Sequence, residues 1–238
     1  KNDGHAISKF SNGAATELWS ATQTRIVGSP APSRDGKWLA VTAERAGGTK
    51  HHLLDIERSS VRLLAESLEI RGTPAWSPDG SFITVAVLQD GEPRLHRVPL
   101  DGAAPSVLVR SYSVNPVWSP DGTFIVYAEA DAGPDFSLKA VTASGEPFPL
   151  PEIKLPRGGR RVSFVPGRNG LIALQGQMRH NNFWYIDLVS GERRQLTNFG
   201  SEFTMRDFDV SPDGREIVFD RRKENSDLAL IELPTRNN

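Results

Sequence analysis

The sequence of 238 residues has no cysteine and no long hydrophobic run. Without cysteine the chain has no disulfide, no thiolate nucleophile and no zinc site built on thiolates. No apolar stretch approaches the roughly 18 residues that cross a bilayer. Residues 1–5 also lack the apolar segment of a signal peptide. We therefore expect no membrane insertion of this segment.

An excess of charge of one sign is also missing, because 28 basic residues face 29 acidic ones. A balanced chain has no general attraction for nucleic acid. The aromatic residues Phe183, Trp184 and Tyr185 are expected to alternate within one strand instead of forming an exposed stacking row. The motifs of serine hydrolases, zinc proteases, P-loop proteins and dinucleotide-binding proteins are absent. We predict no nucleic-acid partner, no cofactor and no catalytic residue.

The five histidines are scattered along the chain. His51 and His52 are adjacent in a predicted strand, so their side chains point to opposite faces and do not easily share one ion. We therefore predict no metal site.

What the sequence does contain is a repeat. The turn Ser-Pro-Asp-Gly occurs at 77–80, 119–122 and 211–214, with a relative at 33–36 and a degenerate copy at 167–170. The last glycines of successive copies are 44, 42, 48 and 44 residues apart. Runs rich in β-branched and aromatic residues surround the turns and are typical of strands. A period in the low forties with four strands is the length of one β-propeller blade.

Chemistry of the turn explains its residues. Proline fixes φ near −65°, the aspartate accepts backbone N–H groups, and glycine takes a positive φ. The repeated aspartates are therefore interpreted as turn residues, not as acids or metal ligands: Asp35, Asp79, Asp121 and Asp213. Trp76 and Trp118, directly before two of the turns, are predicted to be wedges between adjacent sheets.

We predict an all-β chain forming a single β-propeller domain over residues 1–238. Four-stranded blades are expected at about 29–65, 73–109, 115–150, 162–197 and 207–233, and residues 5–20 read as part of an earlier blade. The last blade shows three strands, the third at 228–233. If the partial blade completes the last one, the ring closes on five blades. A start in mid-blade without methionine favours missing upstream strands and six blades.

Several segments resemble the repeats of TolB-like propellers, which are related to WD-type repeats. They are PAWSPDG at 74–80, PVWSPDG at 116–122, and YIDL at 185–188 followed by GE at 191–192 and QLT at 195–197. The resemblance covers nearly the whole chain and implies a propeller. Such propellers occur as the periplasmic TolB protein, as C-terminal parts of bacterial sensor kinases and winged-helix regulators, and as gating domains of prolyl-oligopeptidase-type peptidases. The resemblance favours a periplasmic or other extracytoplasmic location, and the chain's end resembles that of the regulator-type members.

A polar position recurs seven residues before the turn glycine, where a buried inner strand would otherwise be apolar. It holds Ser29, Thr73, Asn115 and Asp207, with Val162 or Ser163 in the fourth copy. Alternation places these residues on one side of their strands, so we predict a ring at the channel mouth. Such a ring could bind a ligand or hold ordered water.

Loops expected on the same face carry many basic residues. Between residues 154 and 194, eight basic residues face two acidic ones. This sector could steer an acidic peptide, an anionic sugar or a phosphate-bearing partner, or its arginines could be solvated on several faces. Residues 152–161, rich in proline and glycine, are expected to form an exposed excursion, either a binding loop or a tolerated insertion.

Our first interpretation is a non-catalytic, monomeric interaction or sensor module that binds a protein, an acidic peptide or a small ligand. The predicted ligand-binding residues at the channel mouth are Thr73, Asn115, Asp207, Arg160, Arg161, Arg206, Arg71, Tyr112 and His180. The second interpretation is a gating propeller of a prolyl-oligopeptidase-type serine peptidase. A third, a lyase or glycosidase, would need a converging acid/base pair or a metal in the channel, for which only Asp207 and Asp209 are candidates.

Overall fold

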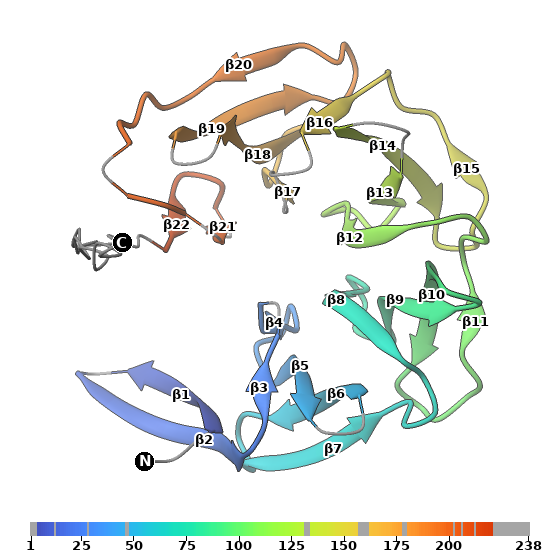
Figure 1. Ribbon diagram of the computed structural model, residues 1–238, viewed down its shortest axis with the longest axis vertical. Coiled ribbons are helices and arrows are strands. Elements are labelled where there is room, and N and C mark those ends of the chain that lie inside the picture. Colours follow the sequence, from blue (N-terminus) through green and yellow to red (C-terminus); the bar gives the residue numbers. More distant parts are fainter. Residues whose placement is uncertain are drawn as a thin grey trace, which may run out of the picture.

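The computed structural model describes residues 4–11, 13–27, 29–45, 48–130, 134–156, 162–177, 180–201, 203–205, 207–211 and 213–220. Within these ranges the regular elements are strands, and they form six antiparallel sheets. The sheets follow one another around a central axis in chain order (Figure 1). No helix in this part of the chain has the length and hydropathy needed to span a membrane.

Each sheet is built from consecutive strands. A hairpin of β1 (Gly4–Ser11) and β2 (Ala14–Thr22) comes first. Blade 1 contains β3 (Arg25–Ile26), β4 (Ala31–Pro32), β5 (Trp38–Arg45), β6 (Gly48–Asp55) and β7 (Ser60–Leu64). Blade 2 contains β8 (Ile70–Trp76), β9 (Phe82–Gln89), β10 (Glu92–Pro99) and β11 (Ser106–Val107).

The later blades repeat this order. Blade 3 contains β12 (Val114–Trp118), β13 (Phe124–Ala130), β14 (Asp135–Thr142), β15 (Pro147–Phe148) and β16 (Lys154–Pro156). Blade 4 contains β17 (Val162–Phe164), β18 (Gly170–Gln177), β19 (His180–Asp187) and β20 (Arg193–Gln195). Blade 5 is described by β21 (Phe208–Val210) and β22 (Ile217–Phe219). The third strand expected at 228–233 lies outside the described residues, and closure on five or six blades stays a prediction.

The inner strands meet at the axis. Strand β4 contacts β8, β8 contacts β12, β12 contacts β17, and β17 contacts β21. Figure 1 shows these strands around the central opening, with the later strands of each blade farther out. The first strand of each blade therefore faces the hub, which is where the sequence placed its polar ring.

The hairpin turns have the hydrogen bonds expected from their residues. In blade 2 the hydroxyl of Ser77 donates to Asp79 Oδ1 at 2.6 Å and accepts the N–H of Phe82 at 3.1 Å. Gly80 has a φ of +70° and donates its N–H to the carbonyl of Ser77. The same bonds recur around Ser33, Ser119 and Ser211. The four aspartates thus have the predicted role in the turns.

The fourth turn lies two residues earlier than the sequence indicated. Val165 accepts the N–H of Arg168 and donates its own N–H to Gly170, while Gly167 has a φ of +72°. Pro166 followed by a glycine with positive φ is typical of a type II turn, whereas the other copies place their glycine at the fourth position of the turn. Arg168, and not Gly170, therefore corresponds to the turn glycine of the other blades. Counted back from Arg168, the ring position of blade 4 falls at residue 161 instead of Val162 or Ser163, and residue 161 lies outside the described part.

Apolar clusters fill the interfaces between successive blades. Separate clusters join blades 1 and 2, 2 and 3, 3 and 4, and 4 and 5. The indole of Trp76 donates to the carbonyl oxygen of Ala31 in blade 1 at 2.8 Å, and that of Trp118 donates to the hydroxyl of Thr84 in blade 2 at 3.1 Å. Both tryptophans are therefore the wedges that the sequence predicted.

The expected excursion at 152–161 is wrong in its first half. Strand β16 pairs with β14, and Ile153 and Leu155 are each 1% exposed in the interface core. The carbonyl of Ile153 accepts the N–H of Leu138 at 2.9 Å. The prolines on either side concealed a period-two pattern in which Ile153 and Leu155 share one face. Residues 157–161 lie outside the described part.

Candidate functional site

A central cavity of about 760 Å³ lies where the inner strands of all five blades meet. The predicted ring residues are among those that line it: Ser29, Thr73, Asn115, Ser163 and Asp207. Its other lining residues include Gly72, Asp209 and, beside the tryptophans, the prolines Pro32, Pro74 and Pro116. The structure therefore brings together Ser29, Thr73, Asn115 and Asp207, which are far apart in the sequence but equivalent in the repeat. Ser163 of blade 4 joins them from the position that corresponds to Asp209.

Irregular pairing explains why polar residues turn towards the hub. The register between β8 and β9 shifts between Arg71 and Ala75, and that between β12 and β13 shifts between Val114 and Val117. In blade 1 the inner strand is split into β3 and β4, which both pair with β5. Such bulges bend a strand and leave residues unpaired. In blades 1, 2 and 3 these interruptions leave the ring residues without a strand partner at equivalent positions of the inner strand.

Two bulge residues have a positive φ. Gly72 has a φ of +70° and Asn115 a φ of +53°. A side chain on Gly72 would be strained, and its Cβ would lie 3.5 Å from Asn115 Oδ1. Asparagine tolerates this left-handed conformation better than most residues. The backbone conformation at Asn115 is thus one reason for a short polar side chain there.

Hydrogen bonds connect ring residues from different blades. The backbone N–H of Ser29 donates to the hydroxyl of Thr73 at 3.3 Å, and the hydroxyl of Ser29 donates to the carboxylate of Asp207. Across the same cavity the hydroxyl of Ser163 donates to Asp209 Oδ1 at 3.3 Å. The first and last blades are therefore linked through the lining of the cavity.

The described lining is acidic. Asp207 and Asp209 lie two residues apart and face the same cavity, as alternate residues along an extended segment do. The described lining contains no lysine, arginine or histidine. In the described chain no group of three His, Asp or Glu side chains could hold a metal ion. The cavity therefore offers carboxylates, hydroxyls and an amide, which can accept hydrogen bonds and attract positive charge.

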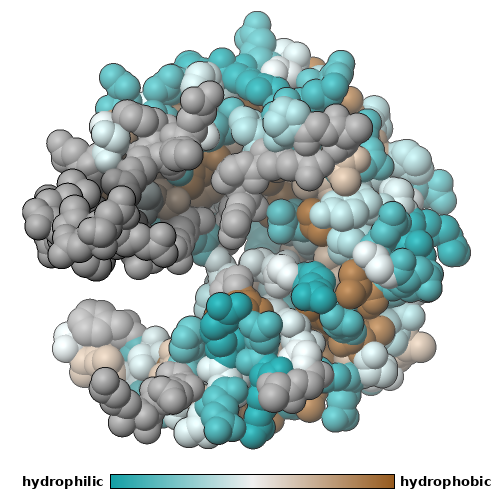
Figure 2. All heavy atoms as spheres, viewed as in Figure 1, coloured by the Kyte–Doolittle hydropathy of each residue, from teal (hydrophilic) through white to brown (hydrophobic). Residues whose placement is uncertain are grey.

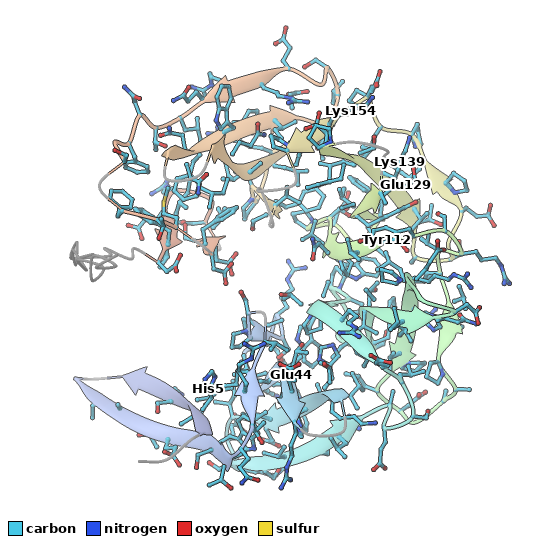
Figure 3. The ribbon with its side chains drawn as sticks, in the orientation of Figure 1. His5, Glu44, Tyr112, Glu129, Lys139 and Lys154 are labelled. Atoms are coloured by element: carbon cyan, nitrogen blue, oxygen red, sulfur yellow. The ribbon has the colours of Figure 1, made fainter. Side chains whose placement is uncertain are left out.

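Two predicted site residues do not reach the cavity. Arg71 keeps regular pairing with Ala86 one residue before the bulge, and it forms an ion pair with Glu69 at 2.5 Å. Figure 3 shows Tyr112 away from the central opening, and its side chain is 37% exposed. Neither residue belongs to the cavity lining. Arg160, Arg161 and Arg206, and the side chain of His180, lie outside the described residues.

Sequence reasoning missed part of the lining. Trp76 and Trp118 border the cavity in addition to wedging the blades, and Pro74 and Pro116 lie beside them. The signal was present, because each proline precedes its tryptophan by two residues in successive repeats. Their rigid rings give the polar cavity a firm apolar border.

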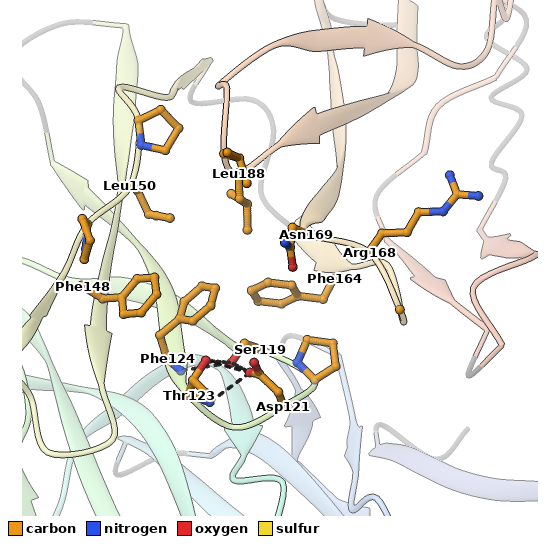
Figure 4. Close-up of a pocket in the computed structure, with 15 residues that line it drawn as sticks. Ser119, Asp121, Thr123, Phe124, Phe148, Leu150, Phe164, Arg168, Asn169 and Leu188 are labelled. Atoms are coloured by element: carbon orange, nitrogen blue, oxygen red, sulfur yellow. Dashed lines mark hydrogen bonds between the residues drawn. The ribbon is translucent and has the colours of Figure 1, made fainter.

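A second cavity, of about 640 Å³, lies between blades 3 and 4 on the side of the hairpin turns (Figure 4). Phe124 stacks on Phe148 at 4.2 Å between ring centroids and meets Phe164 edge-on at 5.7 Å. Asp121 also lines this groove, but its carboxylate is bound to Ser119 and Thr123 within the turn. The groove is therefore mainly apolar, whereas hydrophilic side chains cover much of the described rim of the ring in Figure 2.

Sheets arranged around a hub, with a repeated turn and an apolar cluster between neighbours, define a β-propeller. Residues 10–148 match the TolB beta propeller domain family, and the chain belongs to it. No curated protein matches the sequence.

Solved structures agree on the fold. Putative TolB from Agrobacterium tumefaciens is 19% identical with a TM-score of 0.71, over 88% of this chain and 74% of that one. TolB from Acinetobacter baumannii is 17% identical with a TM-score of 0.65, over 80% of this chain and 50% of that one. This chain thus spans about half the length of the Acinetobacter protein. A prolyl endopeptidase is 13% identical with a TM-score of 0.57, over 94% of this chain and 39% of that one.

Proposed function

We propose that the chain is a non-catalytic interaction module that binds a polar segment of a protein or peptide at the central cavity. The observation that supports this proposal is the convergence of polar side chains from five blades on one cavity of about 760 Å³. A cavity of this size is in the range of ligand sites, and its hydrogen-bonding groups are held by inner strands of a rigid ring.

The charge of the lining favours a basic group in the partner. The basic sector of the sequence suggested an acidic partner, but the described lining contributes Asp207 and Asp209 and no cation. An ammonium or guanidinium group between these carboxylates would gain charge-assisted hydrogen bonds. The roles of Arg160, Arg161 and Arg206 remain predictions from the sequence.

The test compares the tripeptides Gly-Lys-Gly and Gly-Glu-Gly by titration calorimetry or NMR. Gly-Lys-Gly should bind more tightly, and its affinity should fall as salt is raised. Asp209→Asn should weaken binding roughly three- to tenfold. Asp207→Asn should act in the same direction and also loosen the bond with Ser29.

Glu192→Gln is the matched control, because it removes one negative charge from an exposed turn outside the cavity. Its affinity should equal that of the wild type. Tighter binding of Gly-Glu-Gly, or equal losses in Glu192→Gln and Asp209→Asn, would contradict a basic partner at this site. Unfolding midpoints measured for each variant separate loss of binding from loss of fold.

A gating role in a serine peptidase is a second candidate, supported by the similarity to a prolyl endopeptidase. In that case the active site would belong to a catalytic domain outside these 238 residues. Hydrolysis of a fluorogenic proline-containing peptide by the full-length gene product would support it. Absence of that activity, together with binding of Gly-Lys-Gly, would support the interaction module.

A further inference from the structure

In blades 2 to 5 the residue directly before the hairpin turn packs into the interface with the preceding blade. This position holds Trp76 in blade 2, Trp118 in blade 3 and Phe164 in blade 4. In blade 5 it holds Val210, which pairs with Ile217 as Trp118 pairs with Ile125. The interface between blades 4 and 5 therefore lacks the large wedge of the earlier interfaces.

A cavity of about 150 Å³ lies at this interface. Its apolar lining includes Val210 of blade 5 and Ile172 of blade 4. Ile172 occupies the position that Thr84 has in blade 2, seven residues after the start of the turn. Thr84 accepts the hydrogen bond of the Trp118 indole. The cavity thus occupies the place that an indole fills between blades 2 and 3.

Three arginines line the same cavity: Arg168, Arg194 and Arg215. The equivalent residues at the interface of blades 2 and 3 are uncharged: Gly80, Ser106 and Thr123. Compared with the interface of blades 2 and 3, this cavity therefore lacks one indole and has three guanidinium groups in its lining. In Figure 4 the side chain of Arg168 extends away from the groove between blades 3 and 4, which is consistent with its place at this second cavity.

No described acidic residue forms an ion pair with these arginines. Among the described residues, none of the ion pairs includes Arg168, Arg194 or Arg215. Arginine stays protonated at physiological pH, so the three groups repel one another across the cavity. An anion between them would remove this repulsion and could accept paired hydrogen bonds from a guanidinium fork.

We propose that this cavity binds a small organic anion. A single ring or similar apolar group would lie against Ile172, Val210 and Ile217, in the place of the missing wedge. A carboxylate or phosphate on that group would lie among the three guanidinium groups. The cavity is smaller than the 300–1,000 Å³ of drug-sized sites, so the ligand is a compact one.

Phenyl phosphate is the probe, with inorganic phosphate and phenol as its two halves. In titration calorimetry phenyl phosphate should bind at least tenfold more tightly than either half. Arg194→Ala and Arg215→Ala should each weaken it about tenfold, as expected for a lost charge-assisted hydrogen bond. Arg193→Ala removes the same charge from the neighbouring residue outside the cavity and should leave the affinity unchanged.

Val210→Trp tests the cavity itself, because the indole should fill it as Trp118 does and abolish binding while all three arginines remain. If this variant fails to fold, the methyl signals of Ile172 and Ile217 in the wild-type protein answer the same question, since phenyl phosphate must shift both. The proposal is overturned if the probe does not bind at about 10 mM. Equal losses in Arg193→Ala and Arg194→Ala, unchanged binding to folded Val210→Trp, or unmoved methyl signals would also overturn it.

Discussion

The Nδ1 atom of His51 lies 2.7 Å from the hydroxyl oxygen of Thr42, and this hydroxyl donates its proton to the carbonyl of Gly72 at 2.9 Å. Because the hydroxyl has one proton, Nδ1 of His51 must be the donor in their contact, and Nε2 is then unprotonated. Nε2 is buried and has no partner among the described residues. Burial lowers the pKa of His51 from 6.5 to about 4.

This pairing predicts a loss of stability in mild acid. Between pH 6.5 and about 4 the unfolded chain binds a proton at His51 that the folded chain does not, so the free energy of unfolding falls as pH falls. The effect is absent above pH 6.5 and levels off below the folded pKa. Its size is about 2 kcal/mol at pH 5.

Urea unfolding of wild type and His51→Leu at pH 7.5 and pH 5 measures this contribution. The variant should lose about 2 kcal/mol less than the wild type between the two pH values. His52→Gln is the matched control, because His52 is the neighbouring histidine and its side chain is only half-buried. Burial also lowers the pKa of His52. Equal pH dependence of wild type and His51→Leu would show that His51 titrates normally in the folded state.

Asp79 is expected to make a smaller contribution to the pH dependence of stability, through a carboxylate held by hydrogen bonds instead of a buried imidazole. The hydroxyl of Ser77, followed by the N–H and hydroxyl of Ser81, lowers the pKa of Asp79 below 3.8. The ionised carboxylate therefore stabilises the turn at neutral pH, and this contribution disappears as pH falls through the folded pKa. Asp79→Ala should cost about 1 kcal/mol at pH 7, by analogy with lost capping bonds.

Thermal unfolding of Asp79→Ala and Asp121→Ala checks the repeat as well as the residue. Both aspartates make the same bonds, so both variants should lose similar stability at pH 7, and the loss should shrink near pH 3. Binding of Gly-Lys-Gly at the hub should not change. A loss of binding equal to that of Asp209→Asn would give the turn aspartates a functional role that their bonds do not indicate.

The repeat determines which parts of the molecule can be predicted from sequence. Turn residues such as Ser77 and Asp79 act through neighbours a few residues away, so their chemistry can be inferred from the motif. The ring at Ser29, Thr73 and Asp207 follows by counting because each blade has the same register. Blade 4 broke the count, since Val165 replaces the turn serine and a different turn type shifts the equivalent position by two residues.

Other features depend on contacts between blades. The acidic character of the cavity arises because Asp207 and Asp209 lie at the hub. Arg71, two residues before the ring residue Thr73, pairs with Glu69 instead of reaching the cavity. No local pattern shows this difference, because it depends on where each bulge begins. The cavity beside Val210 likewise appears only when one interface is compared with another.

Gly170 and Tyr185 form a pair that can be tested by substitution. Gly170 starts β18, and a Cβ there would overlap the ring of Tyr185. In blade 2 the equivalent pair is reversed, with Phe82 at the glycine position and Arg97 over its ring at 4.0 Å. The aromatic ring thus comes from either strand, provided that the partner leaves room.

Gly170→Ala should destabilise the protein by about 1–3 kcal/mol, as expected for overpacking. Tyr185→Leu in the same chain should recover part of this loss, because leucine leaves room for the methyl group. A double-mutant cycle by urea unfolding measures the coupling, which should be at least 0.5 kcal/mol in favour of the pair. Additive losses would mean that Tyr185 does not contact Gly170.

Leu155 gives the sharpest test of the segment after β15. An exposed excursion would tolerate Leu155→Ala with a change within about 0.5 kcal/mol, whereas a buried leucine typically costs 2–5 kcal/mol when truncated. Leu155 is 1% exposed and packs between blades 3 and 4, so we expect the larger loss. Lys154→Ala is the matched control, because Lys154 lies next to Leu155 in β16 and its side chain is 51% exposed. A small loss in both variants by urea unfolding would show that this segment lies at the surface and that β16 does not belong to the core of blade 3.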